Sequence, residues 1–255
     1  GHWKSERVQK KIGDWMITAI GLVESNHLRV ARFADNMLNV ADTEGDKVEA
    51  QLKFGWEVDT YTIVDAADAV NAVSQSDINI LTDEYYDKYG ILLEGRDPQE
   101  FRRHVEEQAR IEIGFERFLE EKKYQAVVTH FGQLGGLKQL PGLAMQRLMG
   151  KGYGFAAEGD WKTAALYRTT WFMSQGMPKG CSFLEDYTLH FDGEKSAILQ
   201  AHMLEVCPLI AEAKPKLEVH RLSIGIDSET ARLVFTSKQG EGVAATIVDL
   251  GNRFR

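Results

Sequence analysis

The chain has 255 residues, a length that suits one large domain or two of ordinary size. Apolar residues make up 44% of it and charged residues 27%, the usual mixture for a soluble globular protein. The formal net charge of −8, with Lys and Arg scattered along the chain, argues against a nucleic-acid partner. No apolar run approaches the roughly 20 residues of a membrane helix, and the N-terminal residues lack the features of an export signal. Cysteine is limited to Cys181 and Cys207, so we expect two reduced thiols in a cytoplasmic protein rather than a disulfide-built fold.

The first part of the chain mixes helical and strand-like patterns. Apolar residues recur at helical spacing over 4–24, and 28–33 is typical of a strand. The segment 44–54 alternates in a way that predicts another strand. The clearest helix is predicted over 98–121, because it begins at Pro98, a residue type favoured in the first helical turn.

Strands then alternate with helices. A buried strand at 125–131 leads into a Gly-rich loop, and a helix follows that begins at Pro141. A second strand at 152–158 precedes a helix over 161–174. This alternation predicts a mainly parallel sheet with helices on both faces.

After Pro178 the pattern changes to strands separated by turns. The change predicts a second, all-β domain with a boundary near 175–180. Because the last predicted strand runs close to Arg255, we expect the β part to be incomplete. The predicted strands are 182–191, 196–206, 217–224, 231–237 and 243–250.

Glu158 is the first candidate for chemistry. It stands at the carboxyl end of a predicted strand and just before a helix, at the edge of an open α/β sheet where ligands bind. The alternative is a solvated acid whose charge suits the N-terminus of the following helix. Asp160 already provides a cap for that helix, so both interpretations of Glu158 stay open.

Glu185 and His202 form a second candidate pair, on two predicted strands joined by a turn at 192–195. If all four turn residues form the hairpin loop, Glu185 lies directly opposite His202. If the loop is only the first two residues, Glu185 pairs with Gln200 and His202 is its diagonal neighbour on the same face. Either register puts a carboxylate and an imidazole within reach of one ion, and the alternative is an exposed cross-strand pair.

The surroundings of these residues favour a shared metal ion. Both Glu185 and His202 lie in largely apolar stretches, where an unpaired charge is costly. A cation shared with Glu158 would remove that cost for two carboxylates at once. Two Glu oxygens and one His nitrogen suit Mn²⁺ best, Co²⁺ or Mg²⁺ would also fit, and Zn²⁺ is less suited without thiolates.

Longer motifs in the chain resemble those of the L-arabinose isomerases. Motifs of this length and order are highly specific, and the similarity runs across nearly the whole chain. The segments that carry it are Gly154–Leu166 (GFAAEGDWKTAAL), Ser182–Thr188 (SFLEDYT), His202–Pro208 (HMLEVCP), Gly136–Leu143 (GLKQLPGL) and Arg32–Met37 (RFADNM).

The resemblance implies a fold with three parts. Residues 1–27 would be the closing helix of an N-terminal α/β domain that lies outside this chain. Residues 28–177 would form a middle Rossmann-like domain with a parallel sheet, and residues 178–255 the first part of a C-terminal antiparallel β-barrel domain. The family also implies a homo-oligomer, usually a hexamer of two trimers.

The resemblance also implies the site. Two Glu and two His hold Mn²⁺ in the family; the matching metal ligands here are Glu158, Glu185 and His202, and the fourth would lie beyond this chain. The family's sugar contacts match Met37 and Phe131. Glu158 and Glu185 would also be the catalytic acid and base.

The function implied is that of an intramolecular oxidoreductase in arabinose catabolism. It would convert L-arabinose to L-ribulose through an enediol, with D-galactose to D-tagatose as an alternative reaction. Its partners would be the sugar and further subunits, with no nucleic acid and no membrane. We expect the chain alone to bind Mn²⁺ weakly and to turn over sugar poorly. The alternatives are an inactive fragment or assembly module of such an enzyme, and a sugar-binding protein, against which the missing export signal and the β-rich tail count.

Overall fold

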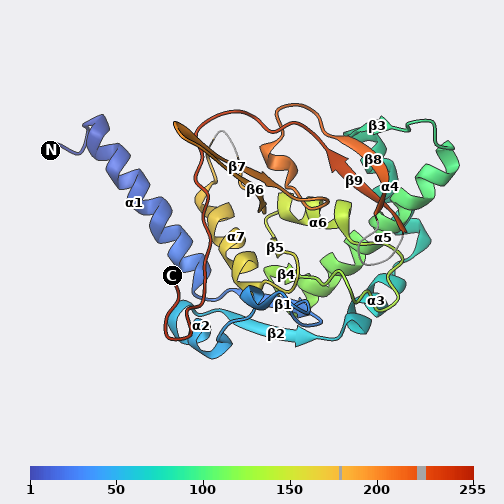
Figure 1. Cartoon of the computed structure of the whole chain (residues 1–255), viewed down its shortest axis with the longest axis horizontal. Coiled ribbons are helices and arrows are strands. Elements are labelled where there is room, and N and C mark those ends of the chain that lie inside the picture. The colour runs from blue at the N-terminus through green and yellow to red at the C-terminus, as the bar shows by residue number, and fades with distance from the viewer. Residues whose placement is uncertain (178–179, 223–227) are drawn as a thin grey trace.

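The computed structural model describes residues 1–177, 180–222 and 228–255 (Figure 1). Helices and strands alternate up to residue 173, and strands dominate the rest. In chain order the elements are α1 (Glu6–Ser25), β1 (Arg29–Phe33), η1 (Ala41–Thr43), α2 (Lys47–Phe54), β2 (Glu57–Tyr61), α3 (Ile63–Asn71), α4 (Gln75–Lys88), β3 (Gly90–Leu92), α5 (Pro98–Lys122), β4 (Ala126–Val128), α6 (Gly142–Gly150), β5 (Gly154–Ala156), α7 (Trp161–Met173), β6 (Glu185–Asp192), β7 (Lys195–Ala201), η2 (Pro208–Ile210), β8 (Lys216–Leu222) and β9 (Ser228–Val234).

A four-stranded parallel sheet forms the centre of the fold, as the alternation of strands and helices predicts. Its strand order is β2-β1-β4-β5, so β1 and β4 are flanked on both sides. Val30 pairs with Val58 of β2 and with Ala126 of β4, and Val127 pairs with Phe155 of β5. Every residue of β4 and β5 is buried, which explains their continuous apolar sequence. Helix α7 packs against β5, β4 and β1, and α5 packs against α3 and α6 (Figure 1).

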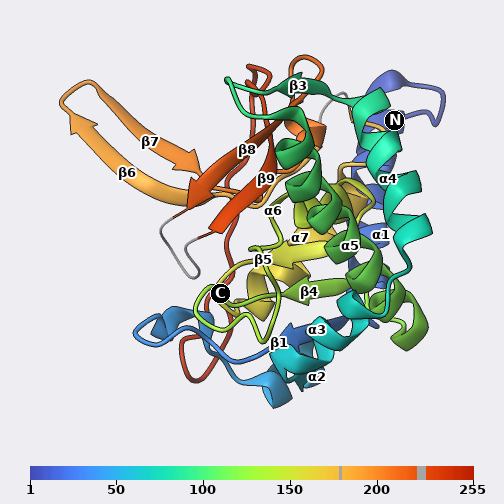
Figure 2. The same cartoon turned by 90° about the vertical axis from the view of Figure 1, so that its right-hand side faces the viewer.

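Two smaller sheets lie beside the parallel sheet. One has the order β3-β8-β9, and the other is the β6–β7 hairpin, which projects from the body of the molecule in Figure 2. Strand β3 comes from the range 28–177 and β8 from the range 178–255, so one sheet draws on both expected domains. The expected boundary runs into residues 178–179, outside the described residues, and the division into domains stays a prediction. The antiparallel β-barrel also stays a prediction.

Two local predictions were wrong. The segment 44–54 contains helix α2 and no strand, because the Asp46 side chain accepts a hydrogen bond from the Glu49 N–H and Gly55 ends the helix at φ 76°. The segment 243–250 forms no strand; its one regular pairing is a bridge between Asp249 and Phe254. That bridge lies near the start of α2, where the Asp249 carboxylate accepts from the Asp46 N–H.

Sequence periodicity missed some elements and placed others only in part. Strand β2 and helices α3 and α4 fall in a range for which we predicted no structure. The predicted strand 217–224 is confirmed as far as Leu222, and its last two residues lie outside the described residues.

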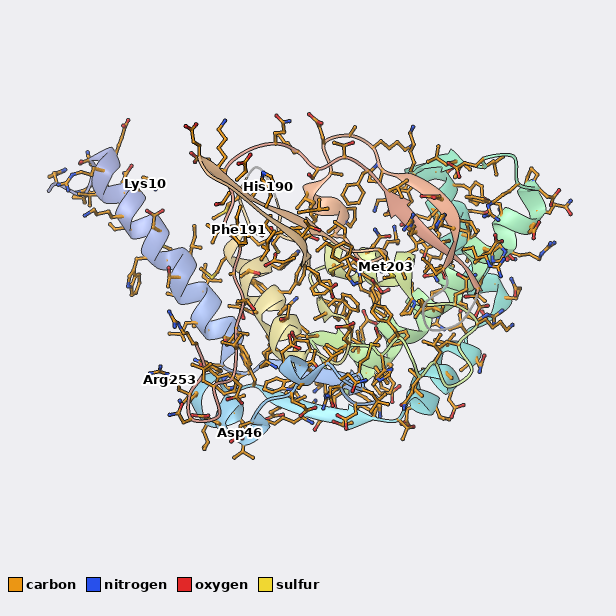
Figure 3. All side chains as sticks on the ribbon, viewed as in Figure 1. Lys10, Asp46, His190, Phe191, Met203 and Arg253 are labelled. Atoms are coloured by element: carbon orange, nitrogen blue, oxygen red, sulfur yellow. The ribbon has the colours of Figure 1, made fainter. Side chains whose placement is uncertain are left out.

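Helix α1 extends away from the body, with Lys10 towards its outer end (Figure 3). Its C-terminal half packs on α7, where a Cβ on Gly21 would lie 2.7 Å from the Met173 side chain. The side chains of Trp15 and Met16 on its outer part are exposed. Neither α1 nor any other helix among the described residues is long and apolar enough to cross a membrane.

The two cysteines are free, as the composition predicts. Cys207 is buried and Cys181 is partly buried. Burial raises the pKa of the Cys207 thiol to about 11, so this thiol is protonated and unreactive near neutral pH.

Close packing between β5 and α7 generates a test of the fold. A Cβ at Gly154 would lie 2.2 Å from the carbonyl oxygen of Ala164, a contact that only a shift of backbone can relieve. We therefore expect Gly154→Ala to lower the free energy of unfolding by about 1–3 kcal/mol, measured by chemical denaturation. The matched control is Gly13→Ala in α1, where nothing lies within 4 Å and the helix should gain about 1 kcal/mol or stay unchanged. Equal stability of the two variants would contradict this packing argument.

Candidate functional site

Three of the predicted site residues meet at one edge of the parallel sheet. Met37, Phe131 and Glu158 follow β1, β4 and β5, which are neighbours and run in the same direction. Their carboxyl ends therefore share an edge, the usual ligand-binding edge of such sheets. Backbone hydrogen bonds join the three loops: the Met37 N–H donates to the Glu158 carbonyl at 3.2 Å, and the Gly159 N–H donates to the Thr129 carbonyl at 3.0 Å.

The backbone at Glu158 has an unusual conformation. Its φ of 59° lies in the left-handed region, which costs free energy for a residue with a side chain, and Gly159 follows with φ 81°. A Cβ at Gly159 would lie 2.6 Å from the Asp35 carbonyl oxygen, so the loop after β1 presses closely on this turn. The helix cap belongs to Asp160, whose carboxylate accepts from the N–H groups of Lys162 and Thr163. The Glu158 carboxylate is therefore not used to cap α7.

The loop after β1 is held beside Glu158 by two buried cations that we did not single out from the sequence. Arg32, 1% exposed, pairs with Asp35 at 2.7 Å and with Glu44 at 2.6 Å. Lys162, also 1% exposed, donates to the Asp42 carbonyl at 2.9 Å and to the Glu44 carbonyl. These contacts fix residues 34–46 over the sheet edge, and with them the position of Met37.

The pairing of β6 with β7 combines features of the two strand registers that the sequence allowed. Near the turn the pairing is that of the first register, and only two residues, Gly193 and Glu194, form the loop. A bulge at Tyr187 then shifts the strands, so that Glu185 pairs with Ala201 and neither register was right at that position. The Glu185 Oε1 still lies 3.6 Å from the Nε2 of His202, as both registers required.

His202 lies at the point where the hairpin meets the parallel sheet. Its ring stacks on Phe131 with centroids 6.0 Å apart and 17° between the planes, and Phe183 lies 5.0 Å away. The side chain is 1% exposed. In Figure 3 the neighbouring Met203 lies inside the fold, whereas His190 and Phe191 lie out on the hairpin.

A further acidic residue, Glu205, contacts the His202 ring at Nδ1, the nitrogen that does not face Glu185. Its Oε2 lies 2.7 Å from the imidazole Nδ1, and its side chain is fully buried. The contact is an ion pair without the geometry of a regular hydrogen bond, and the Glu205 backbone N–H also donates to Nδ1, at 3.4 Å. We did not single out Glu205 from the sequence, although the spacing of three residues from His202 in the segment His202–Pro208 was available as a signal.

The charges of Glu185 and His202 also influence the Glu158 carboxyl group. Burial raises the pKa of the Glu158 carboxyl, the negative charge of Glu185 raises it further, and His202 opposes the rise. The two carboxylates are thus close enough to interact unfavourably when both are charged. A divalent cation between them would relieve that repulsion, and two carboxylate oxygens with one imidazole nitrogen are ligands that suit Mn²⁺.

A different trio of residues has the tightest spacing of possible metal ligands. Among the described residues, one ligand atom each of Glu100, His104 and Glu229 lie within 4.8 Å of one another. This trio joins the start of α5 to β9, away from the sheet edge, and Glu229 also pairs with Arg96. The ligand atoms of Glu158, Glu185 and His202 do not all lie within that distance of one another.

The pKa of His202 gives a direct test of its surroundings. Burial has the largest influence and lowers this pKa, but Glu185 and Glu205 together outweigh it and raise the pKa to about 10. Because this folded-state value exceeds the unfolded value of about 6.5, the stabilisation is fully present below pH 6.5 and is lost as pH rises through about 10. In metal-free protein we expect a histidine ring titration near pH 10 by NMR that is absent from His202→Gln. The unfolding free energy of the unmodified protein should fall between these pH values more steeply than that of the variant, and parallel curves would contradict the assignment.

The site residues lie in segments that match known proteins. The family model for the L-arabinose isomerase central domain matches residues 29–176, and that for the C-terminal domain matches residues 180–255. Over its whole length the chain is 52% identical to the L-arabinose isomerase of Geobacillus thermodenitrificans and 51% identical to that of Mannheimia succiniciproducens, covering 51% and 52% of those proteins. It is 50% identical to the enzyme of Klebsiella pneumoniae and covers 51% of it. The chain thus spans about half the length of the curated relatives it matches, and it belongs to the L-arabinose isomerase family.

Proposed function

We propose that the protein containing this chain converts L-arabinose to L-ribulose through an enediol. Two observations support this proposal in a chain of this family: the 3.6 Å contact between Glu185 and His202, and the electrostatic influence of both residues on Glu158. The same chemistry would serve D-galactose, which would give D-tagatose. The reaction class is supported by relatives named L-arabinose isomerase, of whose length the chain covers about half.

We propose that Glu158, Glu185 and His202 hold a divalent cation, Mn²⁺ in the first place and Co²⁺ or Mg²⁺ as alternatives. Their donor set fits such an ion, and the mutual repulsion of the carboxylates favours one. When bound, the ion would stabilise the negative charge that develops on the sugar carbonyl oxygen.

The carboxylates themselves would move the proton between C2 and C1 of the sugar. One would remove the proton from C2 while the other protonates O1 to give the enediol; the proton would then return to C1 while the second carboxylate takes the proton from O2, which leaves the ketone at C2. A carboxyl whose pKa is raised by burial and by a neighbouring charge, as at Glu158, is better suited to exchange protons near neutral pH. Because the two groups influence each other, they titrate as a pair, and we assign the acid and base roles to the pair.

Met37 and Phe131 would form part of the sugar-binding surface. Both follow strands that end at the same edge as Glu158, and Phe131 also stacks on His202. An aromatic ring beside polar ligands gives a sugar an apolar face to pack on and excludes water from the reacting carbons.

The setting of the enzyme forms part of the same proposal. We propose a cytoplasmic homo-oligomer, a hexamer as in the family, with the domains divided as 1–27, 28–177 and 178–255. Free thiols support a reducing compartment.

Replacement of either carboxylate in the intact enzyme tests the proposal. We expect Glu158→Gln and Glu185→Gln each to lower L-ribulose formation from L-arabinose by about 10²–10⁴-fold or more, because each loses a group that exchanges protons. The thermal midpoint should change little, since Gln keeps the shape of the side chain. The matched control is Glu194→Gln at the tip of the hairpin, which should retain full activity. Near-normal turnover in either site variant would refute the proposal.

The pKa of His202 predicts how Mn²⁺ affinity depends on pH. A metal binds the unprotonated imidazole, and His202 is protonated at neutral pH in the metal-free protein because its pKa is about 10. Calorimetric titration between about pH 6 and 8 should show affinity that rises about tenfold per pH unit, with release of about one proton per Mn²⁺. Affinity that does not change over this range would contradict ligation by His202.

Removal of the ion with a chelator should abolish turnover, and added Mn²⁺ should restore it.

A further inference from the structure

Glu205 is a buried acid that the proposed reaction does not use. Its side chain is fully buried, and it contacts the imidazole of His202 through Nδ1, on the opposite side from Glu185. The backbone N–H of Glu205 donates to Nδ1 in a long hydrogen bond of 3.4 Å, and the carboxylate lies closer to the same nitrogen, at 2.7 Å.

Two acidic side chains, those of Glu185 and Glu205, form ion pairs with the ring nitrogens of His202. Phe131 stacks on the ring and Phe183 lies 5.0 Å away at an angle of 59°, so packing with two aromatic side chains limits how the ring can turn. The Nδ1 atom points to Glu205 and the Nε2 atom points to Glu185. A carboxylate this close to Nδ1 favours a proton on that nitrogen, which would leave Nε2, the nitrogen that faces Glu185, free to bind a metal ion.

Packing alone does not account for Glu205. Apart from the His202 contact, neither of its carboxylate oxygens has a hydrogen-bond partner among the described residues. A buried ion pair is often no more stabilising than apolar side chains of the same volume, because desolvation cancels the attraction. Burial of the Glu205 carboxylate costs free energy, and its contact with the His202 imidazole explains that cost better than packing does.

We propose that Glu205 is a positioning residue, which holds His202 in the tautomer and orientation that present Nε2 to a divalent cation. The inference rests on the proposed metal site and goes beyond it, because Glu205 itself does not touch the ion. A carboxylate on the far nitrogen fixes the ring and makes its other nitrogen more basic towards a metal. Removal of such a group usually weakens metal binding by about 10–100-fold.

The test is Mn²⁺ affinity in the intact protein, measured by calorimetry on four variants. Glu205→Gln keeps the shape of the side chain but removes its charge, and it should weaken Mn²⁺ binding by about 10–100-fold. His202→Ala should weaken binding at least as much. Combining the two changes should weaken binding no further than His202→Ala alone, because Glu205 acts through the imidazole. The matched control is Glu212→Gln, an exposed acid shortly after the same segment, which should bind as the unmodified protein does.

Each outcome has a defined meaning. Unchanged affinity in Glu205→Gln, or an added loss when it is combined with His202→Ala, would overturn the positioning role while leaving the metal site intact. Unchanged affinity in His202→Ala would instead overturn the proposed metal site itself. If Glu205→Gln does not fold, Glu205→Asp keeps the charge but withdraws it from Nδ1, and the inference then requires weaker Mn²⁺ binding at an unchanged thermal midpoint. Undiminished binding in that variant would equally overturn it.

Discussion

The stacking of Phe131 on His202 joins the two parts of the candidate site. Phe131 follows β4 at the edge of the parallel sheet, whereas His202 follows β7 at the base of the hairpin. Without this contact the hairpin, most of whose residues are exposed, would have little to fix its direction. A second link is the Ser182 hydroxyl, which accepts from the Cys207 N–H at 2.9 Å and closes the base of the hairpin. The position of Glu185 relative to Glu158 therefore depends on a few contacts at that base.

The site concentrates charge in places where charge is costly. His202 and Glu205 are buried, Arg32 and Lys162 are buried beneath the adjoining loop, and Glu158 is held in a left-handed backbone conformation. Each of these features lowers stability unless a specific partner offsets it. Their gathering at one edge of one sheet indicates that the surrounding core, rather than the site, supplies the stability of the fold. Such an arrangement is typical of a site prepared to bind a charged ligand.

The sequence predicts the place of the candidate site in the parallel sheet better than the local geometry of the hairpin. Periodicity located β1, α5, β4, β5 and α7, and because parallel strands align their carboxyl ends, Glu158 could be placed at the ligand edge. The pairing of Glu185 with Ala201 could not be predicted, since the bulge at Tyr187 leaves no signal in hydrophobic alternation.

Local and tertiary contacts also explain why some elements and one site residue were not predicted from the sequence. Helix α2 was missed because its alternating residues resemble a strand, whereas Asp46 and Gly55 at its ends determine the outcome. Residues 243–250 have the composition of a strand but gain no neighbouring strand among the described residues. Glu205 was missed because its importance comes from burial, which a single sequence does not reveal.

Two clusters described above combine two carboxylates with an imidazole. One contains His104 and the other contains His202, and they differ in which ring nitrogen is free. At His104 the Gln139 amide nitrogen lies 3.2 Å from Nδ1, and that amide is oriented because its oxygen accepts from Gln108 at 2.9 Å. An amide nitrogen can only donate, so the Nδ1 of a neutral His104 accepts and the ring proton is on Nε2, which lies 3.2 Å from a Glu229 oxygen. Arg96 also neutralises Glu229. That cluster is therefore satisfied by its own protons, despite its tighter spacing.

His202 has the opposite arrangement. Glu205 holds the proton on Nδ1, and Nε2 faces Glu185 across 3.6 Å, so a neutral ring presents its lone pair to a second acceptor. Two acceptors that face each other without a proton between them repel, and the repulsion is relieved either by protonating the ring or by a cation. The raised pKa of His202 corresponds to the first of these, and Mn²⁺ would supply the second. The polar groups that contact the far side of each imidazole, and not only the spacing of the ligand atoms, thus distinguish the two clusters as candidates for a metal ion.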